Sequence, residues 1–221
     1  MRLKSHKFKG VYTDGKKLFT KSIAPKERPF EERIIKSDGD IYRQWDARKS
    51  KLAAAILKGV KETGIKPGQT VLYLGASHGY TPSFVSDIVG EKGFVFALDF
   101  APRVVRDLVF VCEKRSNICP IMADANNPDS YAFQISEADH IYQDIAQKNQ
   151  SEIFLKNVAM YLKKGGLAMI AVKSRSIDVS KKPKAVFDQV RRELEKEMEI
   201  LDFRVLDPYE KDHCVFVCRK D

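Results

Sequence analysis

The sequence lacks the features that would direct a chain to a membrane or to a repetitive architecture. No apolar run approaches the roughly 18 residues that a membrane-spanning helix requires, and the N-terminal stretch MRLKSHKFKG has no signal-peptide core. Internal repeats and low-complexity tails are also missing. We therefore expect a soluble, cytoplasmic globular protein that has no membrane partner.

Cysteine is scarce, with four residues in the chain and no Cys-x-x-Cys pair. Cys214 and Cys218 share one face of the alternating run HCVFVCRK, which favours small apolar side chains over metal ligands. We expect reduced thiols, as in an intracellular chain, and no metal site.

Acidic residues are outnumbered, because 39 lysines and arginines face 30 aspartates and glutamates, which gives a net charge of +9. This excess suits a polyanionic partner but does not by itself establish one. A length of 221 residues with 43% hydrophobic content suffices for one substantial core and a small appendage.

Residues 1–50 differ in pattern from the rest of the chain. Asp14-Gly15 and Asp38-Gly39 each separate two short strand-like runs, which is the strongest local signal for a β-hairpin. The pattern predicts a small β-rich N-terminal domain over 1–50 and a second domain over 51–221. Ser50 is expected to cap a helix that Gly64 ends.

From Val71 onward, strand-like and helix-like segments alternate. The expected strands are Val71–Leu74, Phe94–Leu98, Ile118–Met122, His140–Gln143, Leu167–Val172, Phe203–Leu206 and Val215–Val217. The expected helices cover about 81–89, 102–115, 151–162 and 184–199, and the segment 174–184 is expected to be a mobile loop. Alternation predicts an α/β fold with a parallel, Rossmann-like sheet of seven strands. The last two strands are joined by a connection too short for a helix, so they should pair antiparallel, as is typical of class I methyltransferases.

The stretch VLYLGASHGYT after the first strong strand has two interpretations. Gly75-x-Ser77-x-Gly79 matches the nucleophile elbow of a serine hydrolase, and Asp144 and His213 follow in the required order. The same strand, glycine turn and helix also form the cofactor loop of nucleotide-binding domains.

Acids at the ends of three strands favour the cofactor interpretation. Asp99 lies 24 residues after Gly75, close to the usual spacing of a ribose-binding acid, and Asp124 is placed to meet an adenine amino group. Asp144 follows the expected strand His140–Gln143. Aspartate also favours strand-to-helix turns simply as a helix cap. A hydrolase needs an oxyanion loop after an earlier strand, but only the hairpin segment and one helix precede Val71. The hydrolase interpretation also leaves Asp99 and Asp124 without roles. The second glycine of a dinucleotide loop is missing, so a cofactor without phosphates, such as S-adenosyl-L-methionine, fits better than a dinucleotide.

Four charged residues are expected on the same rim. Lys173 ends a strand beside Asp144, Lys51 begins the helix before the first strand, and His213 opens the last strand. Each alone could be a solvated terminal charge. Together they form a lysine–aspartate–lysine–histidine set.

Several segments closely resemble the fibrillarin family in its archaeal form, and the resemblance spans nearly the whole chain. They include YRQWDARKSKLAAAI, the stretch from VLYLGASHGYT to VVRDL, YQDIAQKNQSEIFLKN, KKGGLAMIAVKSRSID and LDPYEKDHCVF. The resemblance implies an S-adenosyl-L-methionine-dependent 2′-O-methyltransferase acting on rRNA, and in archaea also on tRNA, within a box C/D guide ribonucleoprotein. The implied partners are guide RNA, substrate RNA, a Nop-domain scaffold protein and a kink-turn-binding ribosomal-type protein.

The resemblance also assigns roles to residues. Lys51, Asp144, Lys173 and His213 occupy the catalytic positions. The implied cofactor contacts are Gly75, Ala76, Tyr80, Thr81, Asp99, Phe100, Asp124, Ala125, Asp144, Ile145, Ala146 and Gln147. The chain departs from the family pattern at His78, at Tyr80 in place of a threonine, and at Asp99 in place of a glutamate.

The chemistry suggests a division of labour within the set. A ribose hydroxyl must lose its proton to attack, and we hypothesise that Lys173 is the base. A lysine needs a lowered pKa for this role, and nearby Lys51 and partial burial would both lower it. Asp144 would orient Lys173, and His213 would position the ribose or hold a lysine. One alternative is a cofactor-binding assembly subunit of weak activity. A small-molecule methyltransferase is disfavoured by the two lysines of the set and by the positive net charge.

Overall fold

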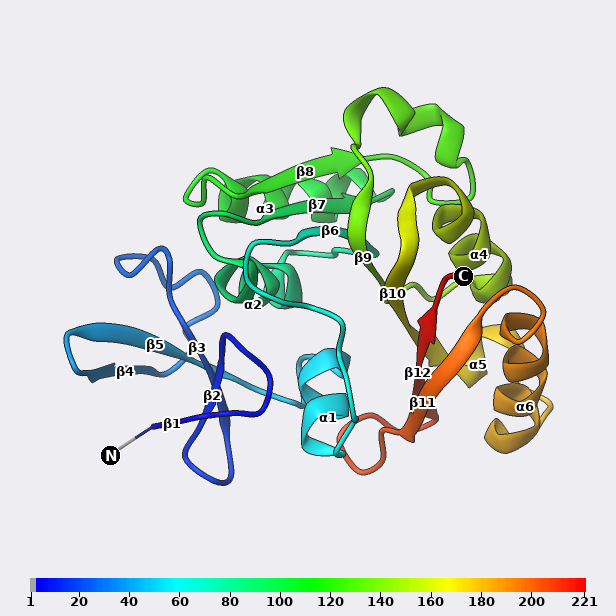
Figure 1. Cartoon of the computed structure of the whole chain (residues 1–221), viewed down its shortest axis with the longest axis horizontal. Coiled ribbons are helices and arrows are strands. Elements are labelled where there is room, and N and C mark those ends of the chain that lie inside the picture. The colour runs from blue at the N-terminus through cyan, green and yellow to red at the C-terminus, as the bar shows by residue number, and fades with distance from the viewer. Residues whose placement is uncertain (1–2) are drawn as a thin grey trace.

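The computed structural model describes residues 3–221, which form two sheets (Figure 1). The first sheet is antiparallel throughout, with the strand order β1-β2-β3-β5-β4. Its strands are β1 (Lys4–Ser5), β2 (Val11–Thr13), β3 (Leu18–Lys21), β4 (Ile34–Ser37) and β5 (Asp40–Trp45).

Both predicted hairpins are present in this sheet. Strands β2 and β3 pair across the Asp14-Gly15 turn, and β4 and β5 pair across Asp38-Gly39. Asp38 and Gly39 have φ angles of 52° and 82°. Positive φ at both central residues defines the type I′ turn, whose twist matches that of the flanking strands.

The second sheet has seven strands in the order β11-β12-β10-β9-β6-β7-β8. They are β6 (Thr70–Leu74), β7 (Phe94–Asp99), β8 (Ile118–Met122), β9 (Ala138–Gln143), β10 (Leu162–Lys173), β11 (Glu199–Val205) and β12 (His213–Arg219). The five strands from β6 to β10 are parallel, whereas β12 is antiparallel to both β10 and β11. The predicted α/β class and the antiparallel last strand are confirmed.

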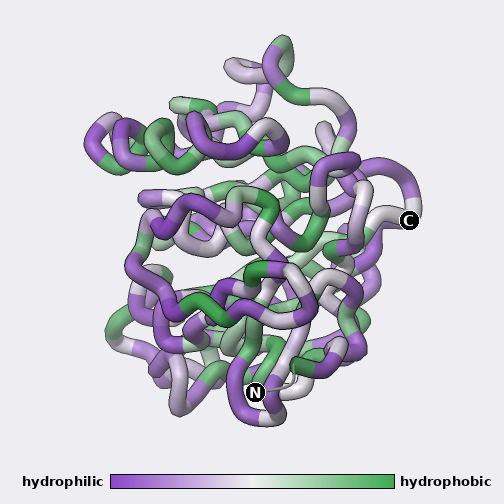
Figure 2. The backbone as a smooth tube through the Cα atoms, turned by 90° about the vertical axis from the view of Figure 1, so that its left-hand side faces the viewer, coloured by the Kyte–Doolittle hydropathy of each residue, from purple (hydrophilic) through white to green (hydrophobic). Residues whose placement is uncertain are grey.

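Helices cover both faces of this sheet. On one face lie α1 (Lys51–Leu57), α2 (Tyr80–Val89) and α3 (Pro102–Cys112), which share a buried core with Trp45 of the first sheet. On the other face lie α4 (Gln150–Tyr161) and α6 (Pro183–Leu194), together with the 3₁₀ helix η1 (Pro128–Gln134). Hydrophilic residues predominate along the peripheral loops, while hydrophobic stretches run through the interior (Figure 2).

Some boundaries differ from the prediction. Helix α1 ends at Leu57 rather than near Gly64, because Gly59 adopts a left-handed φ of +77° directly after the C-cap and turns the chain. The segment predicted as a loop over 174–184 contains the short helix α5 (Ser174–Ile177). The helix η1 was not predicted, since its PDSYAFQ sequence carries no helical periodicity.

The first sheet packs against α2 through buried polar groups. Arg43 of β5 pairs with Asp87 of α2 at 2.8 Å, and both side chains are fully buried. Thr20 of β3 donates a hydrogen bond to the same carboxylate at 2.7 Å. Within the described part of the chain, no helix is both long enough and apolar enough to cross a membrane.

Candidate functional site

The glycine loop is shaped by close contact with the end of β9. Gly75 has φ +84°, and a Cβ atom built there would lie 2.2 Å from the carbonyl oxygen of Asp144. Asp99, at the end of β7, accepts hydrogen bonds from the backbone N–H groups of Ser77 at 2.8 Å and Ala101 at 3.2 Å. Only glycine fits the close approach, and the loop is held against the Asp99 carboxylate.

A cavity of about 280 Å³ opens between this loop and the ends of β7, β8 and β9. Its lining residues are Gly75, Ser77, Leu98, Asp99, Phe100, Ala123, Ala125, Asp144, Ile145, Ala146 and Gln147. Eight of the twelve predicted cofactor residues are therefore brought together around one cavity. Ser77 lines it as a small loop residue, and Leu98 and Ala123 complete its wall.

The other four predicted cofactor residues lie beside the cavity without lining it. Ala76 is buried in the core, and the Thr81 hydroxyl donates a hydrogen bond to the Ser50 hydroxyl at 3.0 Å. The Tyr80 hydroxyl accepts a hydrogen bond from the backbone N–H of Asp46 at 3.1 Å. Burial raises the pKa of Tyr80 to about 12, so this phenol stays neutral.

Asp124 belongs to a polar chain at the rim. Its Oδ1 atom accepts hydrogen bonds from the backbone and side-chain amides of Asn126 at 2.9 and 3.2 Å. The Asn126 side chain also donates to Gln147 at 2.7 Å and accepts from Asn149 at 2.8 Å. This chain ties the end of β8 to the segment after β9.

Lys51 and Asp144 form the central ion pair of the predicted catalytic set. The Lys51 Nζ atom lies 3.0 Å from both carboxylate oxygens of Asp144, and both side chains are 21% exposed. Burial lowers the pKa of Lys51, but the carboxylates of Asp144 and Glu210 outweigh it, so that the net pKa is raised. Lys51 therefore remains an ammonium at neutral pH.

His213 is buried and its tautomer follows from its contact. Its Nδ1 atom lies 2.6 Å from the carbonyl oxygen of Lys211, so this nitrogen carries the proton and donates. Burial, followed by the charge of Lys51, lowers the pKa of His213 despite the Lys211 carbonyl. The ring is therefore neutral at pH 7, and Nε2 remains an acceptor.

Lys173 lies at the end of β10 and pairs in register with His213 of β12. Its side chain is exposed, so the expected partial burial is not found. Within residues 3–221 it makes no ion pair, because Asp144 is occupied by Lys51. One rim of the sheet thus carries Asp144, Lys173 and His213, and the start of α1 adds Lys51. Asp144 pairs with Lys51 rather than with Lys173.

The serine-hydrolase arrangement is not assembled. The Ser77 hydroxyl lies 3.0 Å from Nδ1 of His78, which is exposed. Asp144 pairs with Lys51, and the protonated nitrogen of His213 faces the carbonyl of Lys211. A triad needs these three side chains bonded in sequence, so the nucleophile interpretation is wrong.

Sequence reasoning missed two buried glutamines behind the site. Gln143 precedes Asp144, and Gln150 begins α4; both are fully buried. Gln150 contacts the backbone of Lys173 through both ends of its amide. The only signal for Gln143 was its position next to a predicted catalytic residue, which does not distinguish a surface glutamine from a buried one, and Gln150 had no such signal.

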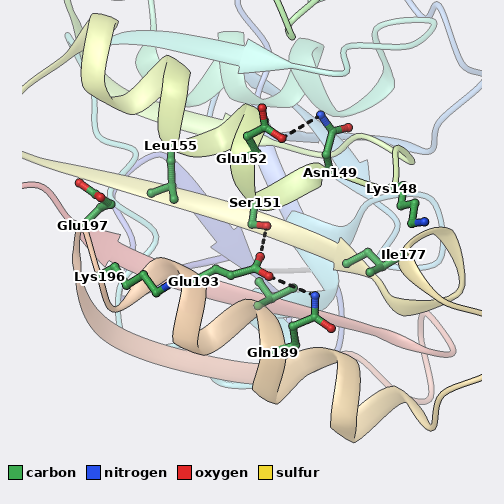
Figure 3. A pocket seen from close by; sticks show the side chains of 11 residues that line it. Lys148, Asn149, Ser151, Glu152, Leu155, Ile177, Gln189, Glu193, Lys196 and Glu197 are labelled. Carbon is green, nitrogen blue, oxygen red and sulfur yellow. Dashed lines mark hydrogen bonds between the residues drawn. The ribbon is translucent and has the colours of Figure 1, made fainter.

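The described chain shows neither a candidate metal centre nor a reactive Cys218 thiol. It contains no cluster of three potential metal ligands, and burial raises the pKa of the Cys218 thiol to about 12. A larger surface pocket, of about 750 Å³, lies between α4 and α6 (Figure 3). It shares no residue with the cavity at the glycine loop or with the predicted catalytic set.

Comparison with known proteins places this geometry. The family model described as Fibrillarin matches residues 3–221. The fibrillarin-like rRNA/tRNA 2′-O-methyltransferase of Thermococcus onnurineus is 50% identical, with all of both chains covered. Its counterpart in Methanocaldococcus jannaschii is 48% identical, covering 95% of this chain and 94% of that protein.

Solved structures agree. The fibrillarin pre-rRNA processing protein of Methanococcus jannaschii has a TM-score of 0.94 at 46% identity, covering 100% of this chain and 98% of that chain. Aeropyrum pernix fibrillarin with natively bound S-adenosyl-L-methionine has a TM-score of 0.91 at 40% identity, covering 99% and 98%. A fibrillarin/Nop5p complex has a TM-score of 0.88 at 37% identity, covering 98% and 100%. An S-adenosylmethionine-dependent methyltransferase of Aquifex aeolicus, at 19% identity and a TM-score of 0.58, covering 80% of this chain and 100% of that chain, shares the fold.

Proposed function

The chain belongs to the fibrillarin family, and on that premise we propose that it methylates ribose 2′-hydroxyls of rRNA, and also of tRNA. The methyl donor is S-adenosyl-L-methionine, which is bound in the solved fibrillarin of Aeropyrum pernix. The observation that carries the proposal is the Lys51–Asp144 pair, with Asp144 lining the cavity that the glycine loop closes.

The cavity suits this donor by its chemistry. Asp99 has two backbone N–H groups on its carboxylate, which leaves further lone pairs to accept the hydroxyls of a ribose. Leu98, Ala125 and Ile145 supply apolar walls for an adenine ring. The glycine at position 75 accommodates the protein's own Asp144 carbonyl, so its presence does not require a phosphate group in the cofactor. When bound, the cofactor supplies an electrophilic sulfonium methyl group.

The catalytic set divides into a charged pair and two free groups. Lys51 holds Asp144 in place at the cavity wall as a charge-assisted pair. Lys173, which makes no ion pair among the described residues, is the proposed base and takes the proton of the attacking hydroxyl in its neutral amine form. His213 offers Nε2 to position the ribose. Alignment can contribute up to about 7–11 kcal/mol and proton removal about 10²–10⁴-fold.

Partners follow from the family. The solved fibrillarin/Nop5p complex supports a Nop-domain scaffold for this chain. Guide RNA, substrate RNA and a kink-turn-binding ribosomal-type protein complete the proposed box C/D assembly. The net charge of +9 on this chain suits a contact with RNA. A cytoplasmic location in an archaeal cell belongs to the same proposal.

The test is methylation of a guided RNA by the reconstituted assembly, with Lys173→Ala as the variant. We expect the variant to lose roughly 10²–10⁴-fold in kcat while it binds S-adenosyl-L-methionine normally. Lys164→Ala, at an exposed position on the same strand, is the matched control and should be unaffected. Near-normal turnover by Lys173→Ala would remove the assignment of the base.

One observation favours the alternative of a weakly active assembly subunit. Tyr80 stands where the family has a threonine at a cofactor contact, and its hydroxyl is engaged by Asp46. Titrating S-adenosyl-L-methionine into the isolated protein separates the two functions. Absent or millimolar binding that the assembly partners do not improve would favour the subunit role.

A further inference from the structure

The edge of the sheet that carries Lys173 has a gap in its backbone pairing. Strand β9 ends at Gln143, which lies opposite Ile170 in the parallel register, whereas β10 continues to Lys173. Within residues 3–221, the last three residues of β10, after Ile170, therefore have no strand neighbour on the β9 side. A buried peptide group in this position needs some other hydrogen-bond partner.

The side chain of Gln150 fills the gap. Its Oε1 atom accepts a hydrogen bond from the backbone N–H of Lys173, and its Nε2 atom donates to the carbonyl of the same residue, both at 3.2 Å. A carboxamide presents an acceptor oxygen and an N–H donor side by side, in nearly the geometry of a peptide, and has a second N–H besides. Gln150 thus replaces the missing strand at one residue, and it is fully buried there.

The position of Gln150 is itself fixed by a hydrogen bond to its backbone carbonyl and by the contacts of the residues before and after it. Its carbonyl accepts a hydrogen bond from the side chain of Gln143 at 2.7 Å, and Gln143 directly precedes Asp144. Its neighbours in the chain point away toward the pocket between α4 and α6, where Ser151 bonds Glu193 and Asn149 bonds Glu152 (Figure 3). The first turn of α4 is therefore anchored to α6 while Gln150 turns inward.

The other side of Lys173 is held by β12. Lys173 pairs in register with His213, and the next residue, Ser174, donates both its backbone N–H and its hydroxyl to the carbonyl of Asp212. The Lys173 backbone is therefore held on both sides while its side chain remains exposed. This arrangement fixes the Cα position of Lys173 and leaves its Nζ atom free to move.

We propose that Gln150 is a positioning residue for methyl transfer, which sets the backbone of Lys173 relative to Asp144 through a peptide-like amide clamp. The inference rests on the proposed function, because it assigns Gln150 an effect on the base of that reaction. A displacement of about 1 Å at such a group costs on the order of 100-fold in rate.

Two variants test the clamp. Gln150→Met keeps the volume and removes both hydrogen bonds, and we expect kcat to fall roughly 10- to 100-fold. The affinity for S-adenosyl-L-methionine and the KM for RNA should stay within about twofold, since Gln150 does not line the cavity. Gln134→Glu, at an exposed position, is the control for the charge that the second variant introduces.

Gln150→Glu tests the donor alone through pH. A protonated carboxyl offers the same donor and acceptor as the amide, and burial raises the pKa of a carboxyl. The ratio of variant to wild-type kcat should therefore approach one in mild acid and fall as the pH rises, a profile that a general loss of packing does not produce. This variant decides the matter even if Gln150→Met fails to fold.

The outcomes are distinct. A ratio that does not change with pH, or a Gln150→Met variant with wild-type kcat, would overturn the clamp while the proposed function stands. Loss of cofactor binding in parallel with kcat would show a structural role only and would also overturn it. An inactive wild-type assembly would instead count against the proposed function.

Discussion

Gly75 occupies a position where space and backbone conformation both require glycine. We expect Gly75→Ala to displace the Asp144 backbone, since the added Cβ would meet its carbonyl oxygen at 2.2 Å, and φ +84° is strained for alanine. The variant should lose stability by on the order of 1–3 kcal/mol and bind S-adenosyl-L-methionine at least tenfold more weakly. Calorimetric titration and urea unfolding measure both effects.

The matched control is Gly15→Ala. Gly15 also has a positive φ, of +97°, but a Cβ built there meets nothing within 4 Å. This substitution carries the backbone strain without the clash, so it should reduce stability and leave cofactor affinity unchanged. Equal effects on affinity from the two substitutions would contradict a specific role for the contact between Gly75 and Asp144.

His140 gives the fold a defined sensitivity to acid. The ring is fully buried, and burial lowers its pKa to about 3; the charge of nearby Lys66 also lowers the pKa, while the Leu167 backbone opposes both effects. The unfolded chain, with an ordinary histidine pKa near 6.5, therefore binds more protons between these values. Stability from this group is complete above pH 6.5 and is lost as pH falls, by about 1.4 kcal/mol per unit.

Urea unfolding at pH 7 and pH 4.5 tests this expectation. His140→Leu removes the titration, so its stability should depend less steeply on pH than that of the wild type, by roughly 2–3 kcal/mol over the interval. His78→Leu, at an exposed position, is the control and should keep the wild-type slope. Identical slopes for all three proteins would contradict the assignment.

At the scale of elements, Ser50 links the first turn of α1 to the first turn of α2. Its hydroxyl accepts from the backbone N–H of Ala53 at 3.3 Å and from the Thr81 hydroxyl at 3.0 Å. We expect Ser50→Ala to cost about 1–2 kcal/mol, because it removes the cap and leaves buried Thr81 without this partner.

Lys51 follows Ser50 directly, so the same substitution should lower kcat more than cofactor affinity. Ser50→Thr keeps the hydroxyl and should restore most of both stability and rate. Stability and kcat that are unchanged in Ser50→Ala would show that the cap does not position Lys51.

Elements with strong local patterns were predictable from the sequence, and those set by tertiary contacts were not. The hairpin turn at Asp38-Gly39 and the parallel strands were found because turn chemistry and apolar runs are local signals. The early end of α1 was missed, since Gly59 and Gly64 look alike in sequence. Both have a positive φ, but only Gly64 meets the His140 ring.

For the whole molecule, the rim was predictable but its pairing was not. Asp144 and Lys173 follow from strand order, because an α/β fold brings the carboxyl ends of parallel strands to one edge. Lys51 begins a helix and His213 begins the antiparallel last strand, so the set of four was completed by the family resemblance. The choice of Lys51 as the partner of Asp144 joins positions 93 residues apart. No periodicity encodes which of two lysines reaches a carboxylate, so the pairing needed the structure.

The division into domains at residue 50 stays a prediction, and the buried charges argue that both parts fold as one unit. Arg43 contacts Glu32 at 2.5 Å, Asp87 at 2.8 Å and the Ser83 hydroxyl at 2.9 Å, and it lies over the Phe84 ring. Asp87 also pairs with Arg115 at 2.7 Å. One network thus joins the first sheet, α2 and the chain after α3.

We expect Arg43→Met to destabilise the whole protein by about 3–5 kcal/mol, because Glu32 loses its buried partner and Asp87 keeps only one cation. That loss is a large part of the 5–15 kcal/mol typical of a domain, so the variant should unfold in a single transition at a much lower denaturant concentration. Arg48→Met, at an exposed position five residues later, is the control and should change stability by less than about 0.5 kcal/mol. Two separate transitions, with only residues 1–50 destabilised, would mean instead that the sheets fold independently.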